Sequence, residues 1–145
     1  MIKKILVAID GSDHADRALD FALDLATKHS AKILLLTAVP PVFLPTPSLN
    51  VMKSQAIADA SAELENSFKA ALSRAEEKAK KLTSLNVFTR LEHGNADEVI
   101  IETAETGGFD LIVIGSRGLG RRDFALGSVS SRVAENASCP VLIVK

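Results

Sequence analysis

The stretch 110–130 limits the possible folds of this chain more than any other. It opens with an apolar run, Leu111 to Ile114, that stands between an aspartate and a glycine and is β-branched at three of its positions. A short apolar run without alternation is typical of a strand buried on both faces of a parallel sheet. Glycines follow, and then apolar residues four apart predict a helix that begins near Ser128. The stretch therefore predicts a strand, a glycine-bearing loop and the N-terminus of a helix.

A helix that begins behind such a loop can bind an anion. Its first backbone N–H groups lack partners and its dipole is positive at this end, which favours phosphate. Gly115, Gly118 and Gly120 permit positive φ and close backbone approach, and we expect Ser128 to be the N-cap and to add a hydroxyl donor. The spacing of the glycines matches neither the P-loop nor the dinucleotide-binding fingerprint. A nucleotide phosphate site is the prediction, and a plain turn between strand and helix is the alternative.

The remainder of the chain alternates between the same two kinds of pattern. Apolar runs predict further strands at Ile5–Ile9, Ile33–Leu36, Val87–Leu91 and Val141–Val144. Amphipathic spacing predicts helices that begin after Ser12 or Asp13, cover 51–82 and 96–104, and start near Ser128. Strands and helices in strict alternation predict an α/β fold, an open, doubly wound five-stranded parallel sheet with helices on both faces, which is Rossmann-like.

The predicted long helix over 51–82 carries an apolar stripe at near-heptad spacing. Its members are Ile57, Leu64, Phe68, Leu72, Ala75, Ala79 and Leu82. Such a stripe predicts core, or core shared with a partner helix, rather than a cofactor site. Prolines at positions 40, 41, 45 and 47 predict a mobile, apolar-bearing loop before this helix.

Composition narrows the function. The chain has 145 residues and a formal net charge of -1, so we expect a single domain, residues 1–145, and no nucleic-acid partner. Cys139 is the only cysteine, and the opening residues lack a signal-peptide cleavage pattern. No run approaches the roughly 18 apolar residues that a membrane span needs. These features predict a cytoplasmic protein that does not bind membranes.

Three predicted strand ends should meet at one edge of the sheet. Ligands of open parallel sheets lie outside the carboxyl ends of the strands, where the strand order reverses. Asp10 follows the first strand, Ala38 and Val39 follow the second and Gly115 follows the fourth, so these three strand ends would open onto a crevice beside Ser128. A carboxylate there can accept hydrogen bonds from an adenine amino group or a ribose hydroxyl. We favour ligand contact by Asp10, with the alternative that it only caps the turn into the first helix.

Catalysis has weaker support in the residues. His14, His29 and His93 lack metal-ligand spacing, and Cys139 in its apolar setting predicts a buried structural thiol. Asp10, Ser12 and His14 resemble a catalytic triad in composition only. We expect a binding protein rather than an enzyme, with slow ATP hydrolysis and a scaffold that binds no nucleotide as alternatives.

Five segments together resemble the universal stress protein family along the whole chain. They are ILVAIDGSDHADRAL, EHGNADEVI from Glu92, DLIVIGSRGLG, GSVSSRV and SCPVLIVK. The resemblance implies a fold of the adenine nucleotide alpha hydrolase-like type, a homodimer, and a stress-response role in signalling or regulation with an unknown partner. It also implies a bound adenine nucleotide, with any Mg²⁺ held by the phosphates.

Carried over by position, the resemblance also implies the site residues. The adenosine part would be contacted by Ala8, Ile9, Asp10 and Ala38. The ribose and phosphates would be held by Gly115, Arg117 and Gly118, and the triphosphate side would be closed by Gly127, Ser128, Val129 and Ser130.

One departure from the family pattern bears on the choice of nucleotide. The ATP-binding branch has nine residues between the second glycine and the Gly-Ser pair, whereas eight lie between Gly118 and Gly127 here. The shorter loop can be absorbed at the surface or can displace the γ-phosphate, with Arg121 and Arg122 available to compensate. The expectation therefore covers ATP, ADP and AMP, with ATP the least secure.

The last predicted strand suggests how two copies would associate. Val141, Leu142, Ile143 and Val144 are apolar, and a terminal strand at the sheet edge leaves backbone groups unpaired. Pairing with the same strand of a second copy about a two-fold axis would satisfy both edges. A homodimer through these residues is expected, and Leu142→Pro is the change expected to remove an edge donor.

Overall fold

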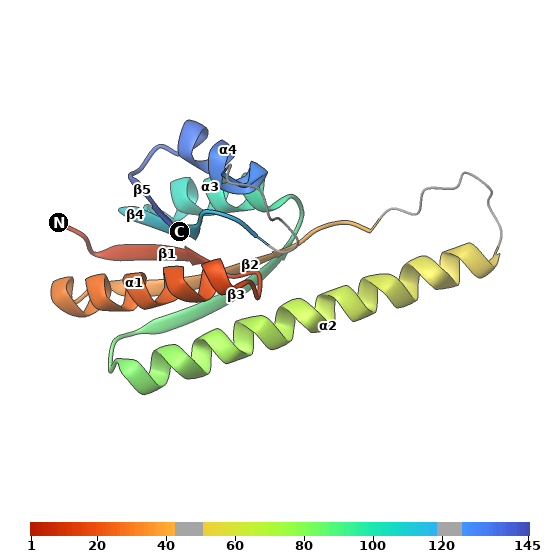
Figure 1. Cartoon of the computed structure of the whole chain (residues 1–145), viewed down its shortest axis with the longest axis horizontal. Coiled ribbons are helices and arrows are strands. Elements are labelled where there is room, and N and C mark those ends of the chain that lie inside the picture. The colour runs from red at the N-terminus through yellow and green to blue at the C-terminus, as the bar shows by residue number, and fades with distance from the viewer. Residues whose placement is uncertain (43–50, 119–125) are drawn as a thin grey trace.

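The structure of this chain is a computed structural model that describes residues 1–42, 51–118 and 126–145, except the side chains of 51–54. Its elements in chain order are β1 (Lys4–Ala8), α1 (Asp13–His29), β2 (Lys32–Val39), α2 (Val51–Leu82), β3 (Val87–His93), α3 (Ala96–Gly107), β4 (Leu111–Gly115), α4 (Ser128–Asn136) and β5 (Val141–Val144). Strands and helices alternate throughout, as the sequence predicts (Figure 1). Most of the expected loop over 40–50 lies outside the described residues, and so does Gly120.

The strands form one parallel sheet in the order β3-β2-β1-β4-β5. The chain builds outward from β1 to β3, returns across β1 with α3, and then builds outward again through β4 and β5. The strand order therefore reverses between β1 and β4, where ligands of such sheets bind. The predicted doubly wound, Rossmann-like sheet is confirmed.

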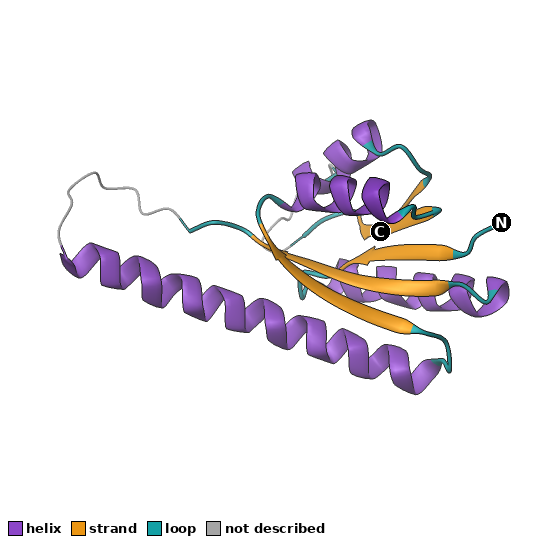
Figure 2. Ribbon diagram, turned by 180° about the vertical axis from the view of Figure 1, so that it is seen from behind, coloured by secondary structure: helices purple, strands orange, loops and turns teal. Residues whose placement is uncertain are grey.

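Helices cover both faces of the sheet (Figure 2). Alternate residues of a strand point to opposite faces, so Ile5 and Val7 of β1 pack with α1 and α2, whereas Leu6 packs with α3 and α4. Both sets are fully buried. Strands buried on both faces explain the uninterrupted apolar runs of the sequence.

Helix α1 is fixed at both ends by its own residues. Ser12 is the N-cap, as expected, and its hydroxyl accepts a hydrogen bond from Ala15 N at 3.1 Å. The helix ends at Ser30, which adopts the left-handed conformation with φ 54°. The start of α1 is thereby held close to the end of β1.

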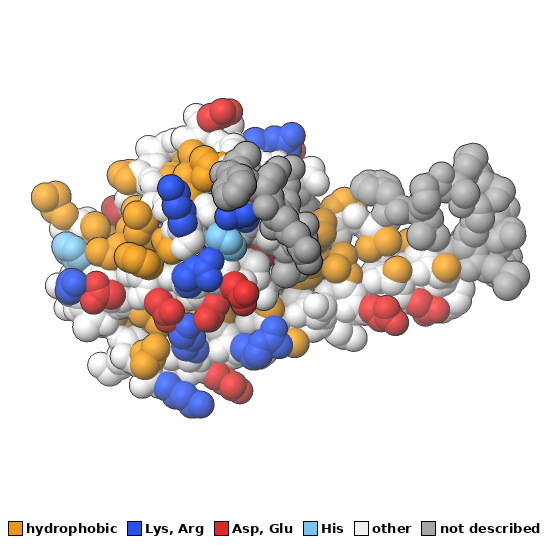
Figure 3. All heavy atoms as spheres, viewed as in Figure 1, with side chains coloured by type: hydrophobic (Ala, Val, Ile, Leu, Met, Phe, Trp, Pro, Cys, Tyr) orange, Lys and Arg blue, Asp and Glu red, His pale blue; other side chains and the backbone are white. Residues whose placement is uncertain are grey.

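Helix α2 is core only along part of its length. Phe68, Leu72, Ala75 and Ala79 are buried, whereas Ile57 is 38% and Leu82 is 63% exposed. The half before Phe68 extends away from the sheet (Figure 1), and apolar side chains lie along it on the face shown in Figure 3. The stripe is therefore core of this chain in its middle only, and the alternative that its ends are shared with a partner helix stays a prediction.

No helix among the described residues is long and apolar enough to cross a membrane.

Candidate functional site

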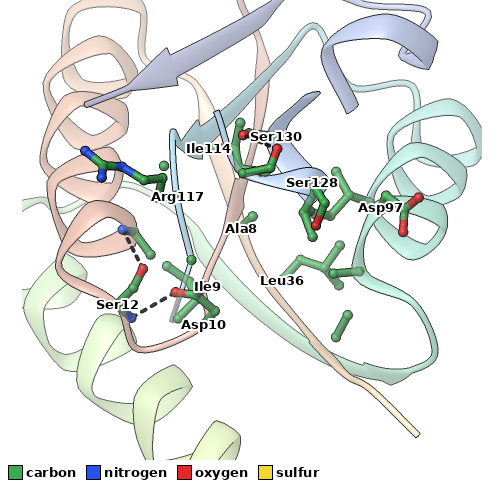
Figure 4. A pocket seen from close by; sticks show the side chains of 18 of the residues that line it. Ala8, Ile9, Asp10, Ser12, Leu36, Asp97, Ile114, Arg117, Ser128 and Ser130 are labelled. Carbon is green, nitrogen blue, oxygen red and sulfur yellow. Dashed lines mark hydrogen bonds between the residues drawn. The ribbon is translucent and has the colours of Figure 1, made fainter. Parts of the chain in front are cut away.

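A cavity of about 510 Å³ opens at the carboxyl ends of β1 and β4, where the strand order reverses (Figure 4). This volume is ordinary for a small-molecule site. The structure brings all the sequence-predicted site residues to its lining, namely Ala8, Ile9, Asp10, Ala38, Gly115, Arg117, Gly118, Gly127, Ser128, Val129 and Ser130. Their contact with a ligand stays a prediction.

Asp10 caps the turn into α1, one of the two roles that the sequence left open, and its contact with a ligand stays a prediction. Its Oδ1 accepts a hydrogen bond from Ser12 N at 2.8 Å, which caps the turn into α1. Its Oδ2 lies beside Gly118, because a Cβ added to that glycine would stand 2.8 Å from this oxygen. Asp10 also lines the cavity. One carboxylate oxygen therefore holds the turn, and the other lies at the loop that follows β4.

The N-terminus of α4 lies at the cavity without a side-chain cap. The N-cap is Gly127, with φ −63° and ψ 157°, and among the described residues no side-chain hydrogen bond caps the helix. The expectation that Ser128 is the N-cap is wrong, because Ser128 is already the first helical residue. Its exposed side chain lines the cavity instead. A helix N-terminus without a side-chain cap among the described residues is a place that favours an anion.

Ser130 ties this helix to the loop after β4. Its hydroxyl is buried and donates to Ser116 O at 2.8 Å and to Gly127 O at 3.0 Å. Gly127 N donates to Ser116 O at 2.7 Å, and Ser116 N donates to Val144 O at 2.7 Å. The same loop is joined to α1 through Ser116 Oγ and His14 Nδ1, 3.1 Å apart. Ser116 therefore positions the site, a role that the sequence analysis missed.

The glycines of the site serve close approach rather than positive φ. Among the described glycines, positive φ occurs at Gly11, Gly94 and Gly108. Gly115 and Gly118, where the sequence permits positive φ, do not have it. A Cβ at Gly115 would stand 2.8 Å from two atoms of His14. Gly115 is therefore required because α1 passes directly over the end of β4.

Arg117 differs in part from its expected role. The guanidinium group points away from Ser128 and toward α1 (Figure 4). Its Cα would lie 3.4 Å from a Cβ added at Gly127, so the backbone of Arg117 lies against the start of α4. The backbone of this residue, rather than its guanidinium group, is thus the part that lies at the N-terminus of α4. Arg121 and Arg122 lie outside the described residues.

The cavity lining includes further residues that the sequence analysis did not name as site residues. Among them are Pro40 after β2, Phe68 of α2, Asn95, Ala96 and Asp97 at the start of α3, and Arg132 of α4. Asp97 Oδ2 and Arg132 Nη1 are 3.6 Å apart and join the two helices across the rim. The sequence did carry a signal for Asn95, Ala96 and Asp97, because they follow β3 and parallel strands end at the same edge of the sheet. Phe68 was hidden within a stripe that has core spacing.

The histidines and the cysteine do not converge. Within 1–42, 51–118 and 126–145 no group of three His, Cys, Asp or Glu side chains could hold a metal ion. His93 Nε2 lies 2.8 Å from Glu65 Oε1 on α2. Cys139 is half-buried rather than buried, and burial raises the pKa of its thiol. These residues contribute no reactive centre beside the cavity.

The family model for universal stress proteins matches residues 1–145. This chain belongs to the universal stress protein family. Universal stress protein YxiE of Bacillus subtilis (strain 168) is 36% identical over 149 residues, with all of both chains covered. The universal stress protein in the QAH/OAS sulfhydrylase 3′ region of Thermus aquaticus is 37% identical over 152 residues, again with all of both chains covered.

Solved universal stress proteins share the fold of this one. UspA from Lactobacillus plantarum superposes with a TM-score of 0.86 at 25% identity and covers 99% of this chain and 98% of its own. A universal stress protein in complex with cAMP gives a TM-score of 0.73 at 29% identity, covering 99% of this chain and 97% of its own. The universal stress protein from Archaeoglobus fulgidus in complex with dAMP gives 0.67 at 25% identity, with both chains fully covered.

Proposed function

We propose that this universal stress protein binds an adenine nucleotide in the cavity between the ends of β1 and β4. The observation that carries the proposal is the uncapped N-terminus of α4, which faces a cavity of about 510 Å³. Two related proteins of the same fold are solved with cAMP and dAMP, which supports an adenine nucleotide over other phosphate compounds.

The cavity has a polar end and an apolar end, which sets the direction of the ligand. The polar end is formed by Gly127 and the first turn of α4, where free N–H groups and the helix dipole favour phosphate. The apolar end lies beyond β1, where Ala38 stands near the end of β2 and Pro40 follows the strand. Asp10, which follows β1, lies between the polar end and the apolar end, at a position suited to a ribose hydroxyl. The base therefore lies toward β2.

The proposal covers AMP, ADP and ATP, and the loop before α4 favours the shorter ligands. That loop is one residue shorter than the ATP-binding pattern of the family implies. The cAMP and dAMP of the related structures each carry one phosphate, which a single helix N-terminus can hold. Any Mg²⁺ would be held by the ligand's own phosphate oxygens, as we expect from the family.

Binding without chemistry is the role that we assign to the site. We propose a regulatory or signalling protein of the cytoplasm rather than a catalyst, as the resemblance to the family implies. We further propose that it works as a homodimer through Val141, Leu142, Ile143 and Val144. β5, which contains them, is an edge strand of the sheet.

Isothermal titration with AMP, ADP and ATP tests the proposal, together with thermal unfolding in the presence of each nucleotide. We expect heat of binding and a higher unfolding temperature, because ligand at 100 times its Kd stabilises the native state by about 2.7 kcal/mol. Mass spectrometry of nucleotide extracted from the purified protein would identify the bound species. Absence of heat and of stabilisation at millimolar nucleotide would favour the scaffold alternative.

A further inference from the structure

Phe68 connects the long helix α2 to the nucleotide cavity. It is 9% exposed and lines the cavity, although it belongs to a helix that packs on β2, β3 and α1. It is the one described α2 residue in the cavity lining. The rest of the buried stripe of α2 faces the sheet and α1.

Phe68 also marks the point at which α2 leaves the body of the protein. Along the described side chains of α2, residues 55–67 are exposed or half-buried, and Phe68 is the first that is buried. From there Ala71, Leu72, Ala75 and Ala79 are buried at helical spacing. Figure 1 shows the half of α2 that projects from the body of the protein. Phe68 is the first buried side chain after this half, and it is also the residue of α2 that lines the cavity.

Polar, exposed contacts also lie at this boundary. Glu65 lies 2.8 Å from His93 Nε2 and 4.0 Å from Lys69 Nζ, and the His93 and Lys69 side chains are more than half exposed. Exposed pairs of this kind contribute little to stability. Phe68 is therefore the first buried apolar side chain with which α2 meets the body of the protein, ahead of Ala71 and Leu72.

Phe68 lies at the end of the cavity where the proposed ligand places its base. α2 packs on β2 and β3, and these strands are separated from β4 and α4 by β1. The phosphate end at α4 and the Phe68 end therefore lie on opposite sides of β1. An aromatic ring at the second end favours a planar, heteroaromatic group.

We propose that Phe68 is the base-contacting wall of the site and couples nucleotide occupancy to the packing of α2. The proposal rests on the adenine-nucleotide function proposed above. A base in the cavity gives the Phe68 ring a partner and so stabilises the helix at its boundary. Because coupling is reciprocal, anything that holds α2 in place also tightens nucleotide binding.

Matched variants of α2 test the contact. Phe68→Ala removes the wall, Phe68→Leu keeps most of its volume, and Leu72→Ala is the control, since Leu72 is also 9% exposed but lies outside the cavity lining. We expect Phe68→Ala to weaken AMP binding about tenfold in calorimetry, relative to Leu72→Ala. Ribose 5-phosphate, which lacks the base, should bind the parent and Phe68→Ala equally. Phe68→Leu should fall between.

Hydrogen exchange tests the coupling itself. Saturating AMP should slow amide exchange over residues 60–70 several-fold in the parent protein and in Leu72→Ala, and not in Phe68→Ala, with residues 75–82 as the internal reference. Equal AMP affinity in Phe68→Ala and Leu72→Ala would overturn the inference while leaving the proposed function intact. Unchanged amide exchange over residues 60–70 despite AMP binding would also overturn the inference and leave the proposed function intact. A parent protein that binds no AMP would overturn both.

Discussion

Single glycines around the cavity differ in what a side chain would meet there. A Cβ at Gly127 would stand 3.3 Å from Ser116 O and 3.4 Å from Arg117 Cα, which is crowded but not a clash. The φ of Gly127 is −63°, which any residue can adopt. Gly127 is therefore needed at the mouth of the phosphate end for space alone, and its conformation does not require glycine.

Gly127→Val is accordingly expected to abolish nucleotide binding and to leave the fold in place. The branched side chain would fill the approach to the N-terminus of α4 and press on the loop at Ser116. Titration with AMP measures the loss, and circular dichroism checks the fold. Ser128→Ala, which removes an exposed hydroxyl, should weaken binding less. If both variants bound like the parent protein, the phosphate would have to bind elsewhere.

Gly115 predicts the opposite phenotype. A Cβ there would stand 2.8 Å from both the backbone carbon and the Cβ of His14, and backbone cannot move aside cheaply. Gly115→Ala is expected to lower the free energy of unfolding by about 1–3 kcal/mol, as overpacking does. Urea denaturation beside Gly127→Ala, where the contacts are 3.3 Å or longer, separates the two effects. Equal stability of the two variants would contradict the packing argument.

Asp110 predicts a dependence of stability on pH. Its Oδ2 accepts hydrogen bonds from Lys3 N at 2.8 Å and Lys4 N at 3.0 Å, and these lower the pKa of the carboxyl group. A pKa lowered by folding stabilises the protein above the unfolded pKa, and the contribution is lost as the pH falls through the folded pKa.

Asp110→Asn should therefore lower the free energy of unfolding at pH 7, and the difference from the parent should shrink below about pH 4. Urea denaturation of both proteins at about pH 7 and about pH 3 measures it. A difference that stayed constant with pH would show that the hydrogen bonds do not depend on the charge.

At the scale of elements, the strands were predictable because burial on both faces leaves uninterrupted apolar runs. The strand predicted at Ile33–Leu36 was too short. β2 continues to Val39, because Thr37 is buried and its hydroxyl donates to Ile9 O at 2.8 Å. A polar residue inside the run hid this continuation. The packed half of α2 was predictable from its stripe, but its end at Phe68 depends on where the sheet stops, which spacing does not encode.

The site was predictable to the same extent as the strand ends. Asp10, Ala38 and Gly115 meet because parallel strands bring their carboxyl ends to one edge. Contacts between elements far apart in sequence were not predictable, among them the pairing of Asp97 with Arg132 and the bond of Ser130 to Ser116. The N-cap of α4 was misplaced by one residue, because serine is the commoner cap and the glycine before it carries no side-chain signal.

The register of β5 shows which of its backbone groups are free. Ile112 N donates to Pro140 O and Ser116 N donates to Val144 O, so the even-numbered residues of β5 face β4. Backbone groups of a strand alternate in direction, which turns Val141 and Ile143 toward the open edge. Leu142→Pro would therefore break a bond to β4 rather than remove an edge donor, and the choice of Leu142 from the sequence is corrected to Ile143.

At the scale of the whole molecule, the two edges of the sheet are unlike. At the β3 edge α2 packs against the strand, and at the other edge Val141, Leu142 and Ile143 of β5 are half-buried. Among the described residues, α1 reaches this second edge, where Arg17 Nε donates to Lys145 O at 3.0 Å, and Phe21 one turn further on is 55% exposed. The edge therefore combines free backbone groups with apolar side chains, as an interface between two copies requires.

The homodimer proposed through β5 follows from this edge, and Ile143→Pro tests it. Proline at an outward-facing position of an edge strand removes one donor and leaves the bonds to β4 in place, so the monomer should keep its fold. Two β5 strands pairing antiparallel about a two-fold axis would lose that hydrogen bond twice, once from each copy. We expect the parent protein and Ile143→Val to sediment as dimers at tens of micromolar, and Ile143→Pro to sediment as a monomer with unchanged circular dichroism. A parent protein that remains monomeric at that concentration would contradict the proposed homodimer through β5. A proline variant that dimerises as before would contradict it too.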